Sequence, residues 1–222
     1  GKTVELNALW YNALKIMARL AEKYEDKQLC RKYLEMAEKT KKSFAEKFYN
    51  AGKHCLYDVL GDSKVRPNQL FALSLSHPII DNAEIAEQVL STVENKLLNK
   101  YGLKTLSSDE DGYVDIYEGS AYKRDSSYHQ GITWPWLLGL YYDALKNTMI
   151  IEKNKTKRQE LEEKIINLVD TTKETFKAEM FERSSIGTIS EIYDSTEPYE
   201  ERGAFAQAWS VAEIFRIVLN KR

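Results

Sequence analysis

Apolar residues recur at intervals of three or four positions through most of the chain, the spacing that places them on one side of an α-helix. The first such stripe contains Leu6, Leu9, Trp10, Ala13, Met17, Leu20 and Tyr24. We expect one helix that buries this stripe and takes Thr3 as its N-cap. A second stripe runs from Leu29 to Phe48 after a short polar turn, so these two helices should form an antiparallel hairpin.

Five further segments carry helical signals. Pro67 can open a third helix that continues to Leu75, and Asp81 with Glu84 resembles a capping box at the start of a fourth. The remaining three run from Trp134 to about Met149, from Leu161 to about Met180, and from Ala204 to Leu219. Long loops are expected near residues 50–66, 99–130 and 184–202, and loops of this length in a compact domain are often functional.

Strand signals are weak. Only residues 113–117, Tyr-Val-Asp-Ile-Tyr, alternate between apolar and polar positions, and no other segment pairs with them convincingly. The fold class is therefore all-α. Helix hairpins in series, with chemistry-bearing residues in the connecting loops, favour a toroid or solenoid that carries its site at one end of the ring of helices.

The composition is that of one soluble globular domain. The chain has 222 residues, and its 32 basic and 34 acidic residues give a formal net charge of −2 without a long basic block, which argues against a nucleic-acid partner. No apolar run reaches the roughly 18 residues that a membrane span needs. Two cysteines make no disulfide framework, so we expect a reducing compartment, by default the cytoplasm.

Glu191 is the residue with the most suggestive surroundings. It lies between Ile189 and Ile192 in a predicted loop, where an apolar environment raises the basicity of a carboxylate and prepares it to activate water. Aromatic residues and hydrogen-bonding side chains occur nearby, a combination typical of sugar binding. From the residues alone, a solvated loop glutamate is the alternative interpretation.

Four segments, in order, resemble one known family. They are Glu-Leu-Asn-Ala-Leu-Trp-Tyr-Asn-Ala-Leu at 5–14, Arg-Pro-Asn-Gln-Leu-Phe-Ala-Leu-Ser-Leu at 66–75, Tyr-His-Gln-Gly-Ile-Thr-Trp-Pro-Trp at 128–136, and the block 187–213 that begins Gly-Thr-Ile-Ser-Glu-Ile-Tyr-Asp. Together they resemble the C-terminal domain of glycogen debranching enzymes. The resemblance covers the whole chain and implies an (α/α)6 barrel with amylo-α-1,6-glucosidase activity, which removes the glucose left at a trimmed branch point of glycogen.

The resemblance also implies roles for individual residues. Glu191 matches the general base of an inverting hydrolysis, in which a second carboxyl group protonates the leaving oxygen. The matched segments imply substrate contacts for a set of side chains: Glu5, Asn7, Trp10, Asn68, Gln69, His129, Gln130, Trp134, Trp136, Asp194, Gln207 and Trp209. Among the tryptophans, we expect Trp10 or Trp134 to stack on sugar. We expect Arg202 to pair with Asp194 or the loop backbone, because pairing with Glu191 would weaken that base.

The family's general acid is an aspartate in a Trp-Met-Asp-like motif, and the sequence does not contain this motif. In the family it precedes the Glu-Leu-Asn-Ala-Leu-Trp helix. The resemblance therefore implies that residues 1–222 form one domain, the C-terminal part of a barrel, and that this part is catalytically incomplete. An open barrel exposes apolar flanks, so we expect self-association or repacking. Ser195 departs from the family pattern, which commonly has glycine there.

Several alternatives stay open at this point. The tryptophans lie at helical positions where an aromatic is more often core than a sugar platform, and His129 is as well suited to capping a helix as to donating to a hydroxyl. His54, His77 and His129 show no metal-ligand spacing, so no metal or other cofactor is expected. Rival functions are a non-catalytic α-glucan-binding domain, a helical scaffold for protein partners, and a barrel glycosidase that cleaves another α-linkage.

Overall fold

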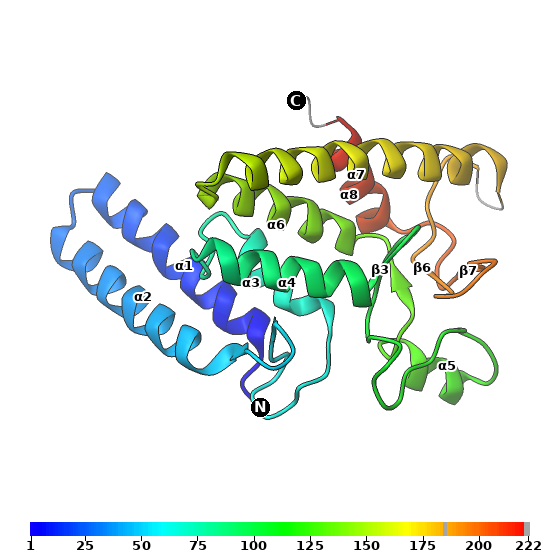
Figure 1. The fold of residues 1–222 in the computed structure, drawn as a ribbon, viewed down its shortest axis with the longest axis horizontal. Helices are drawn as coiled ribbons and strands as arrows, with labels where there is room; N and C mark the ends of the chain where they lie inside the picture. Colours follow the sequence, from blue (N-terminus) through cyan, green and yellow to red (C-terminus); the bar gives the residue numbers. More distant parts are fainter. Residues whose placement is uncertain (184–185, 220–222) are drawn as a thin grey trace.

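The computed structural model describes residues 1–183 and 186–219 and consists mainly of helices (Figure 1). In chain order these are α1 Val4–Lys23, α2 Lys27–Phe48, the 3-10 helix η1 Pro67–Leu70, α3 Phe71–Ser74, α4 Ala83–Lys96, α5 Ala121–Ser127, α6 Leu137–Ile151, α7 Lys155–Glu182 and α8 Ala208–Leu219. The predicted all-α class is confirmed. The predicted third helix is the η1–α3 pair, because Pro67 sits at the first helical position, where its missing N–H costs nothing.

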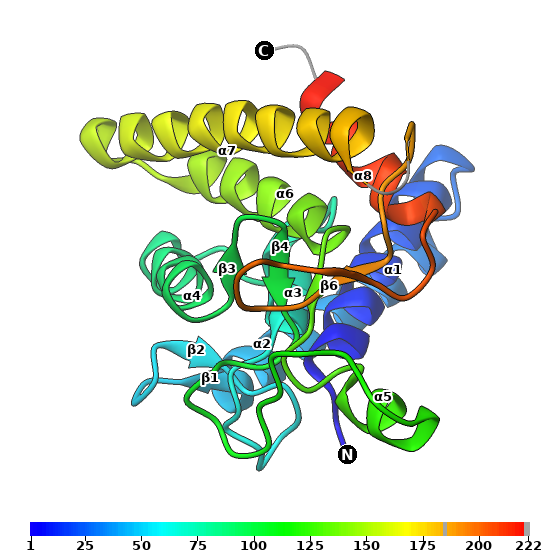
Figure 2. The same ribbon diagram turned by 90° about the vertical axis from the view of Figure 1, so that its right-hand side faces the viewer.

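The helices form an arc with a second layer outside it. Helices α1, α3, α6 and α8 pack against one another in that order, and α2, α4 and α7 lie against them from the outside. Figure 2 shows α7 lying across α6 and reaching α8. This inner and outer alternation is that of a toroid built from helix hairpins. Its inner helices begin at one end of the molecule, where the long loops gather.

A small sheet joins those loops and was not predicted. Five very short strands pair antiparallel in the order β3 Leu98–Asn99, β4 Gly102–Lys104, β5 Thr133–Trp134, β6 Ile192–Tyr193 and β7 Glu201–Arg202. A separate pair is β1 Tyr49–Asn50 with β2 Cys55–Leu56. Strands of two or three residues leave no readable alternation in sequence. Residues 113–117, the predicted strand, are loop instead.

The buried face of α1 differs from the predicted one. The side chains that enter the core are Val4, Ala8, Tyr11, Leu14, Ala18 and Ala21. The predicted stripe is exposed instead, with Leu6 at 63%, Trp10 at 51% and Tyr24 at 76% of full exposure. Helix α1 is thus apolar on two sides, and periodicity alone cannot say which side the chain covers.

Helix starts also differ in detail from the prediction. Thr3 is the N-cap of α1, but its side chain makes no capping hydrogen bond. Asn82, rather than Asp81, caps α4 by accepting a hydrogen bond from the Ile85 amide at 3.0 Å, while Asp81 pairs with Lys41. The segment from Trp134 starts as strand β5 and turns into helix only at Leu137. The described residues contain no helix long and apolar enough to cross a membrane.

Candidate active site around Glu191

Glu191 lies directly before β6, at the edge of the hairpin that β6 and β7 form. Its flanking residues Ile189 and Ile192 are fully buried and anchor the backbone on both sides of it. The Glu191 amide donates to the Ala204 carbonyl at 2.9 Å, and the Gln207 amide donates to the Ile189 carbonyl at 3.0 Å. The isoleucines that drew attention in the sequence therefore fix the carboxylate's position, while the carboxylate itself is half-buried.

Three donors converge on the Glu191 carboxylate. The Tyr128 hydroxyl and the Gln207 side-chain amide donate to Oε1 at 2.5 and 3.1 Å, and the Ala204 backbone N–H donates to Oε2 at 3.0 Å. Charge-assisted hydrogen bonds of this kind are short and orienting. Burial and the neighbouring carboxylate raise the pKa of Tyr128, so its hydroxyl stays protonated and keeps donating. Glu191 is thus held in one orientation.

Gly203 allows this arrangement. Its φ of +69° lies in the left-handed region, and a Cβ at this position would collide with Glu191 Oε2. The glycine thus serves both the turn after β7 and the close approach of the carboxylate.

Asp194 is held at the other end of strand β6, directly after it. Arg202 donates to Asp194 Oδ2 through Nε at 3.0 Å and through a terminal nitrogen at 2.8 Å. The Tyr117 amide donates to Oδ1 at 2.8 Å, and Asp194 is only 4% exposed. The predicted Arg202–Asp194 pair is confirmed. Asp194 therefore joins the hairpin to the loop that contains Tyr117.

Aromatic rings form a continuous wall next to Glu191. The Trp134 ring is stacked with His129 at 5.3 Å and edge-on to Trp209 at 5.8 Å, and Trp209 stacks with Trp136 at 5.5 Å. Trp134 is 4% exposed and its indole donates to the Tyr128 carbonyl, so its observed contacts are structural and its stacking on sugar stays a prediction. Trp209 is 45% exposed, and its ring and that of His129 are the exposed ones in this wall.

Arg66 connects three loop segments at the same end. It donates to the carbonyls of Thr105 and His129 at 3.0 and 2.7 Å and to Gln130 Oε1 at 2.9 Å. Partial burial and the Arg66 charge hold the pKa of His129 below its usual range, against the opposite pull of Glu191. His129 is therefore neutral at pH 7 and able both to donate and to accept hydrogen bonds.

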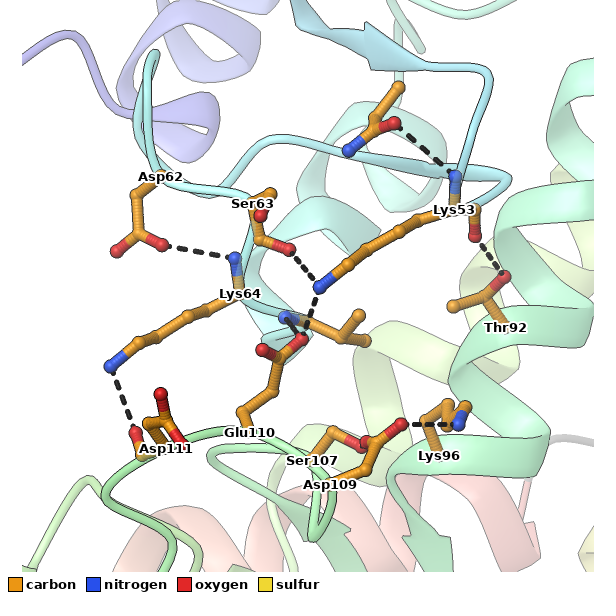
Figure 3. Close-up of polar contacts among 12 residues, drawn as sticks. Lys53, Asp62, Ser63, Lys64, Thr92, Lys96, Ser107, Asp109, Glu110 and Asp111 are labelled. Carbon is orange, nitrogen blue, oxygen red and sulfur yellow. Dashed lines mark hydrogen bonds and ion pairs between the residues drawn. The ribbon is translucent and has the colours of Figure 1, made fainter.

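The backbone next to Arg66 is clamped by the polar contacts in Figure 3. Glu110 Oε1 accepts from the Val65 amide at 3.1 Å and from the Lys53 ammonium at 2.7 Å, and Lys64 donates to the Asp111 carbonyl at 3.0 Å. Lys53, Val65 and Glu110 also line a cleft of about 510 Å³ between α4 and the two loops. These contacts tie residues 53–65 to residues 109–111 and so fix where Arg66 emerges.

These positions and contacts can be compared with known proteins. A family model described as amylo-alpha-1,6-glucosidase matches residues 1–216. The chain belongs to the amylo-alpha-1,6-glucosidase family. Two solved structures share its fold. A sialidase superposes with a TM-score of 0.71 at 13% identity, over 96% of this chain and 19% of its own. The neutral trehalase Nth1 from Saccharomyces cerevisiae gives a TM-score of 0.66 at 15% identity, over 99% of this chain and 38% of its own.

The comparisons confirm the predicted mostly-α toroid fold, which both solved structures share with this chain. The chain spans about a fifth and about two fifths of the two structures that it matches.

The other family-matched side chains divide into structural and accessible ones. Gln69 is fully buried; it accepts from the Leu56 amide and donates to the Arg66 carbonyl, so it holds the loop and does not reach a ligand. Asn7 donates to the Thr3 carbonyl within its own helix at 2.7 Å. Asn68 and Gln130 are half-buried. Trp10 is exposed on α1, away from the aromatic wall that the ring contacts define.

Two residues at this end were missed from the sequence, Tyr128 and Asp58. Tyr128 stands in the matched segment 128–136, but only the fold shows that its hydroxyl reaches Glu191. Asp58 lies beside Glu5; burial and the Glu5 charge raise its pKa to about 6, against the pull of Arg66. Asp58 Oδ1 and Glu5 Oε2 are buried and have no hydrogen-bond partner among the described residues. The loop at 50–66 was the only sequence signal for Asp58.

A metal has no evident place here. Within residues 1–183 and 186–219, no three His, Cys, Asp or Glu side chains are grouped so as to hold a metal ion. The two cysteines, Cys30 and Cys55, are not joined. The polar groups of the site instead suit hydroxyl groups and water.

Proposed function

We propose that this chain supplies the base-bearing side of an inverting α-1,6-glucosidase that removes the single glucose at branch points of glycogen or a related branched α-glucan. The observation that carries the proposal is the Glu191 carboxylate, fixed by three donors beside an aromatic wall. Membership of the amylo-alpha-1,6-glucosidase family supports the linkage. The cytoplasm, where two unjoined cysteines stay reduced, suits the proposal.

Glu191 acts on water in this proposal. Its two oxygens receive three hydrogen bonds, which leaves lone-pair capacity for a water on the substrate side. The carboxylate removes a proton from this water as the water attacks the anomeric carbon from the face opposite the leaving oxygen. The attack inverts the α-linkage, so the first product is β-glucose.

The sugar itself meets two kinds of surface. The exposed Trp209 ring offers an apolar face. Asp58 and Glu5 offer carboxyl oxygens without protein partners, and neutral His129 offers a ring nitrogen. Groups of this kind discriminate strongly between sugars, because an unmatched hydroxyl leaves a buried polar group unpaired.

The general acid comes from polypeptide outside these 222 residues in this proposal. It stands across the scissile bond, roughly 6.5 to 9.5 Å from Glu191, so that a water fits between them. The support is the open arc of inner helices, which begins with α1 and its row of exposed apolar side chains. Helices that close the ring would cover this row and bring the acid opposite Glu191.

A proton NMR time course tests the proposal. The substrate is a maltooligosaccharide that bears one α-1,6-linked glucose. Two proteins are compared: this chain, and an extended protein that adds the family's upstream segment with its Trp-Met-Asp motif. We expect β-glucose first from the extended protein and no glucose from the chain alone.

Three results would contradict parts of the proposal. Release of α-glucose first would rule out inversion. Glucose from the chain alone would place the acid within residues 1–222, with Asp115 and Asp125 the first to test. Saturable glucan binding without hydrolysis by the extended protein would favour a non-catalytic binding domain.

A further inference from the structure

The hairpin that carries Glu191 has a second face, and this face holds a separate group of charged residues. Cross-strand partners in an antiparallel pair point to the same side, and Tyr193 pairs with Glu201. The neighbouring pair, Ile192 with Arg202, points to the opposite side, as does Asp194. Tyr193 and Glu201 therefore face away from the Asp194–Arg202 pair, toward the C-terminal end of α7.

Helix α7 presents a buried carboxyl group to this face. Glu179 is 4% exposed, and its Oε1 accepts a hydrogen bond from the fully buried Tyr193 hydroxyl at 2.9 Å. Glu201 is the neighbouring carboxyl group, and its interaction with Glu179 raises the pKa of Glu179. Arg183, one turn further along, lies 2.9 Å from Glu201 Oε1 and 3.5 Å from Glu179 Oε2. One guanidinium thus serves two carboxyl groups.

A hydrogen bond between two carboxyl groups requires a proton on one of them. With that proton the pair carries one negative charge, which the single positive charge of Arg183 balances. Without it, a second negative charge stands in a buried site beside the first, and this is costly. Burial and the neighbouring Glu201 raise the pKa of Glu179 to about 7, while Tyr193 and Arg183 pull it down.

The described groups that contact Arg183 and Tyr193 in addition to the two carboxyl groups are uncharged. The Tyr101 ring stacks on Tyr193 at 4.5 Å, and its hydroxyl accepts from Arg183 at 2.7 Å. The Tyr199 carbonyl accepts from a further Arg183 nitrogen at 3.4 Å. The Lys100 ammonium lies over the outer side, 5.4 Å from the centre of the Tyr101 ring. Arg183 is thus the cation in direct contact with both carboxyl groups.

We propose that Glu179 and Glu201 share one proton, and that this proton fastens the β6–β7 hairpin to α7 and so positions Glu191 and Asp194. Loss of the proton near neutral pH loosens the hairpin. Glu179 and Glu201 are then positioning residues, since they act through Tyr193 and the hairpin backbone rather than on the substrate. Their importance for the base rests on the proposed function, whereas the shared proton does not.

The sign of the pH effect follows from the direction of the shift. An acid whose pKa is raised in the folded chain stabilises the fold fully below its unfolded pKa, near 4.5, and loses that contribution as the pH rises through about 7. The hairpin is therefore tightest on the acid side of neutrality. A Glu179→Gln substitution replaces the shared proton with a permanent amide donor, and its oxygen still accepts from Tyr193.

Two-dimensional NMR of the 222-residue chain between pH 5 and 8.5 tests the proposal without any glucan. We expect the amide signals of Tyr193, Asp194 and Glu201 to shift with a midpoint near pH 7, and we expect this transition to vanish in Glu179→Gln. A Glu182→Gln variant is the matched control, since Glu182 lies exposed three residues further along the chain. His129 also titrates near Glu191, but at a lower pH, and its transition persists in both variants.

A transition near pH 7 that persists unchanged in Glu179→Gln would overturn the shared proton, as would its absence from the wild-type chain. Glu201→Gln repeats the test from the other carboxyl group if Glu179→Gln does not fold. If the transition is lost in Glu179→Gln, but the wild-type signals of Glu191 and Asp194 do not change across the pH range, the pair has a structural role only and the positioning proposal is overturned. None of these results bears on whether the extended protein releases β-glucose.

Discussion

The Glu191 loop and helix α1 differ in how fully the described residues cover them. Around Glu191, buried isoleucines, three hydrogen-bond donors and a close-fitting glycine leave the carboxylate a single orientation. Along α1, Leu6, Trp10 and Leu20 are exposed at 63%, 51% and 42%. The difference teaches that contacts within this chain are enough to orient the Glu191 carboxylate, whereas the same chain leaves one apolar side of α1 exposed.

The largest expected effect is on kcat, from a change at Glu191, the proposed base. Exchange of Glu191 for Gln in the extended protein keeps the shape and the aromatic wall but removes the base, which should lower kcat about 10²- to 10⁴-fold. The matched control is Glu197→Gln, an exposed residue in the same loop region. Steady-state rates from released glucose measure both. Equal rates for the two variants would remove Glu191 from the mechanism.

The two sides of α1 can be compared with adjacent residues. Tyr11 is 5% exposed and Trp10 is 51% exposed. Replacing Tyr11 with Ala leaves a cavity and should reduce the free energy of unfolding of this chain by roughly 3 to 5 kcal/mol. Replacing Trp10 with Ala should reduce it by about 1 kcal/mol or less.

Urea unfolding followed by circular dichroism gives both numbers, and sedimentation shows whether Trp10→Ala lowers self-association. If the upstream segment covers α1, Trp10→Ala should reduce the free energy of unfolding more in the extended protein than in the 222-residue chain. If Trp10→Ala costs the same with and without the upstream segment, the ring does not close over α1.

The donors around Glu191 come next in size. Tyr128→Phe removes one hydrogen bond to a charged group, worth about 1.5 to 3 kcal/mol, and nothing else. In the extended protein we expect kcat to fall roughly 10- to 100-fold with little change in KM, because the base is misplaced and the sugar contacts remain. A rise in KM at constant kcat would instead make Tyr128 a substrate ligand.

The smallest effect concerns the glycine that admits the carboxylate. Gly203→Ala places a methyl group against Glu191 Oε2 at a position with φ of +69°. The backbone strain should reduce the free energy of unfolding by about 1 kcal/mol. The displaced carboxylate should in addition lower kcat in the extended protein. Gly187→Ala, at φ of +83° with open space around it, controls for strain alone. Identical rates for both variants would show that the collision is relieved without moving Glu191.

The sequence predicted most helices but not how they close the site. Periodicity and Pro67 located the η1–α3 segment, and the motif at 187–194 identified Glu191. Periodicity could not choose between the two apolar sides of α1, because that choice depends on which neighbours are present. The strands were invisible because each has only two or three residues, and β5 pairs with partners far along the chain, such as Leu103 with Trp134 and Thr133 with Tyr193.

Side-chain roles showed the same limit. Trp134 and Gln69 belong to matched segments, yet both are buried and hold the loops together. Tyr128 belongs to a matched segment too, but its contact with Glu191 spans 63 positions of the chain. Ser195, which departs from the family pattern, uses its hydroxyl to donate to the Gly131 carbonyl and so ties the hairpin to the Tyr128 segment. Such contacts depend on tertiary packing and leave no local signal.

Azide rescue tests the central claim, that Glu191 activates the attacking water, most directly. The extended protein with Glu191→Ala is incubated with α-glucosyl fluoride, whose leaving group needs little protonation, in the presence of sodium azide. Azide is a nucleophile that needs no base and fits the space that the shortened side chain leaves. The account predicts restored turnover and β-glucosyl azide as the product. Hydrolysis by the variant at the wild-type rate without azide, and without formation of the glucosyl azide, would contradict it.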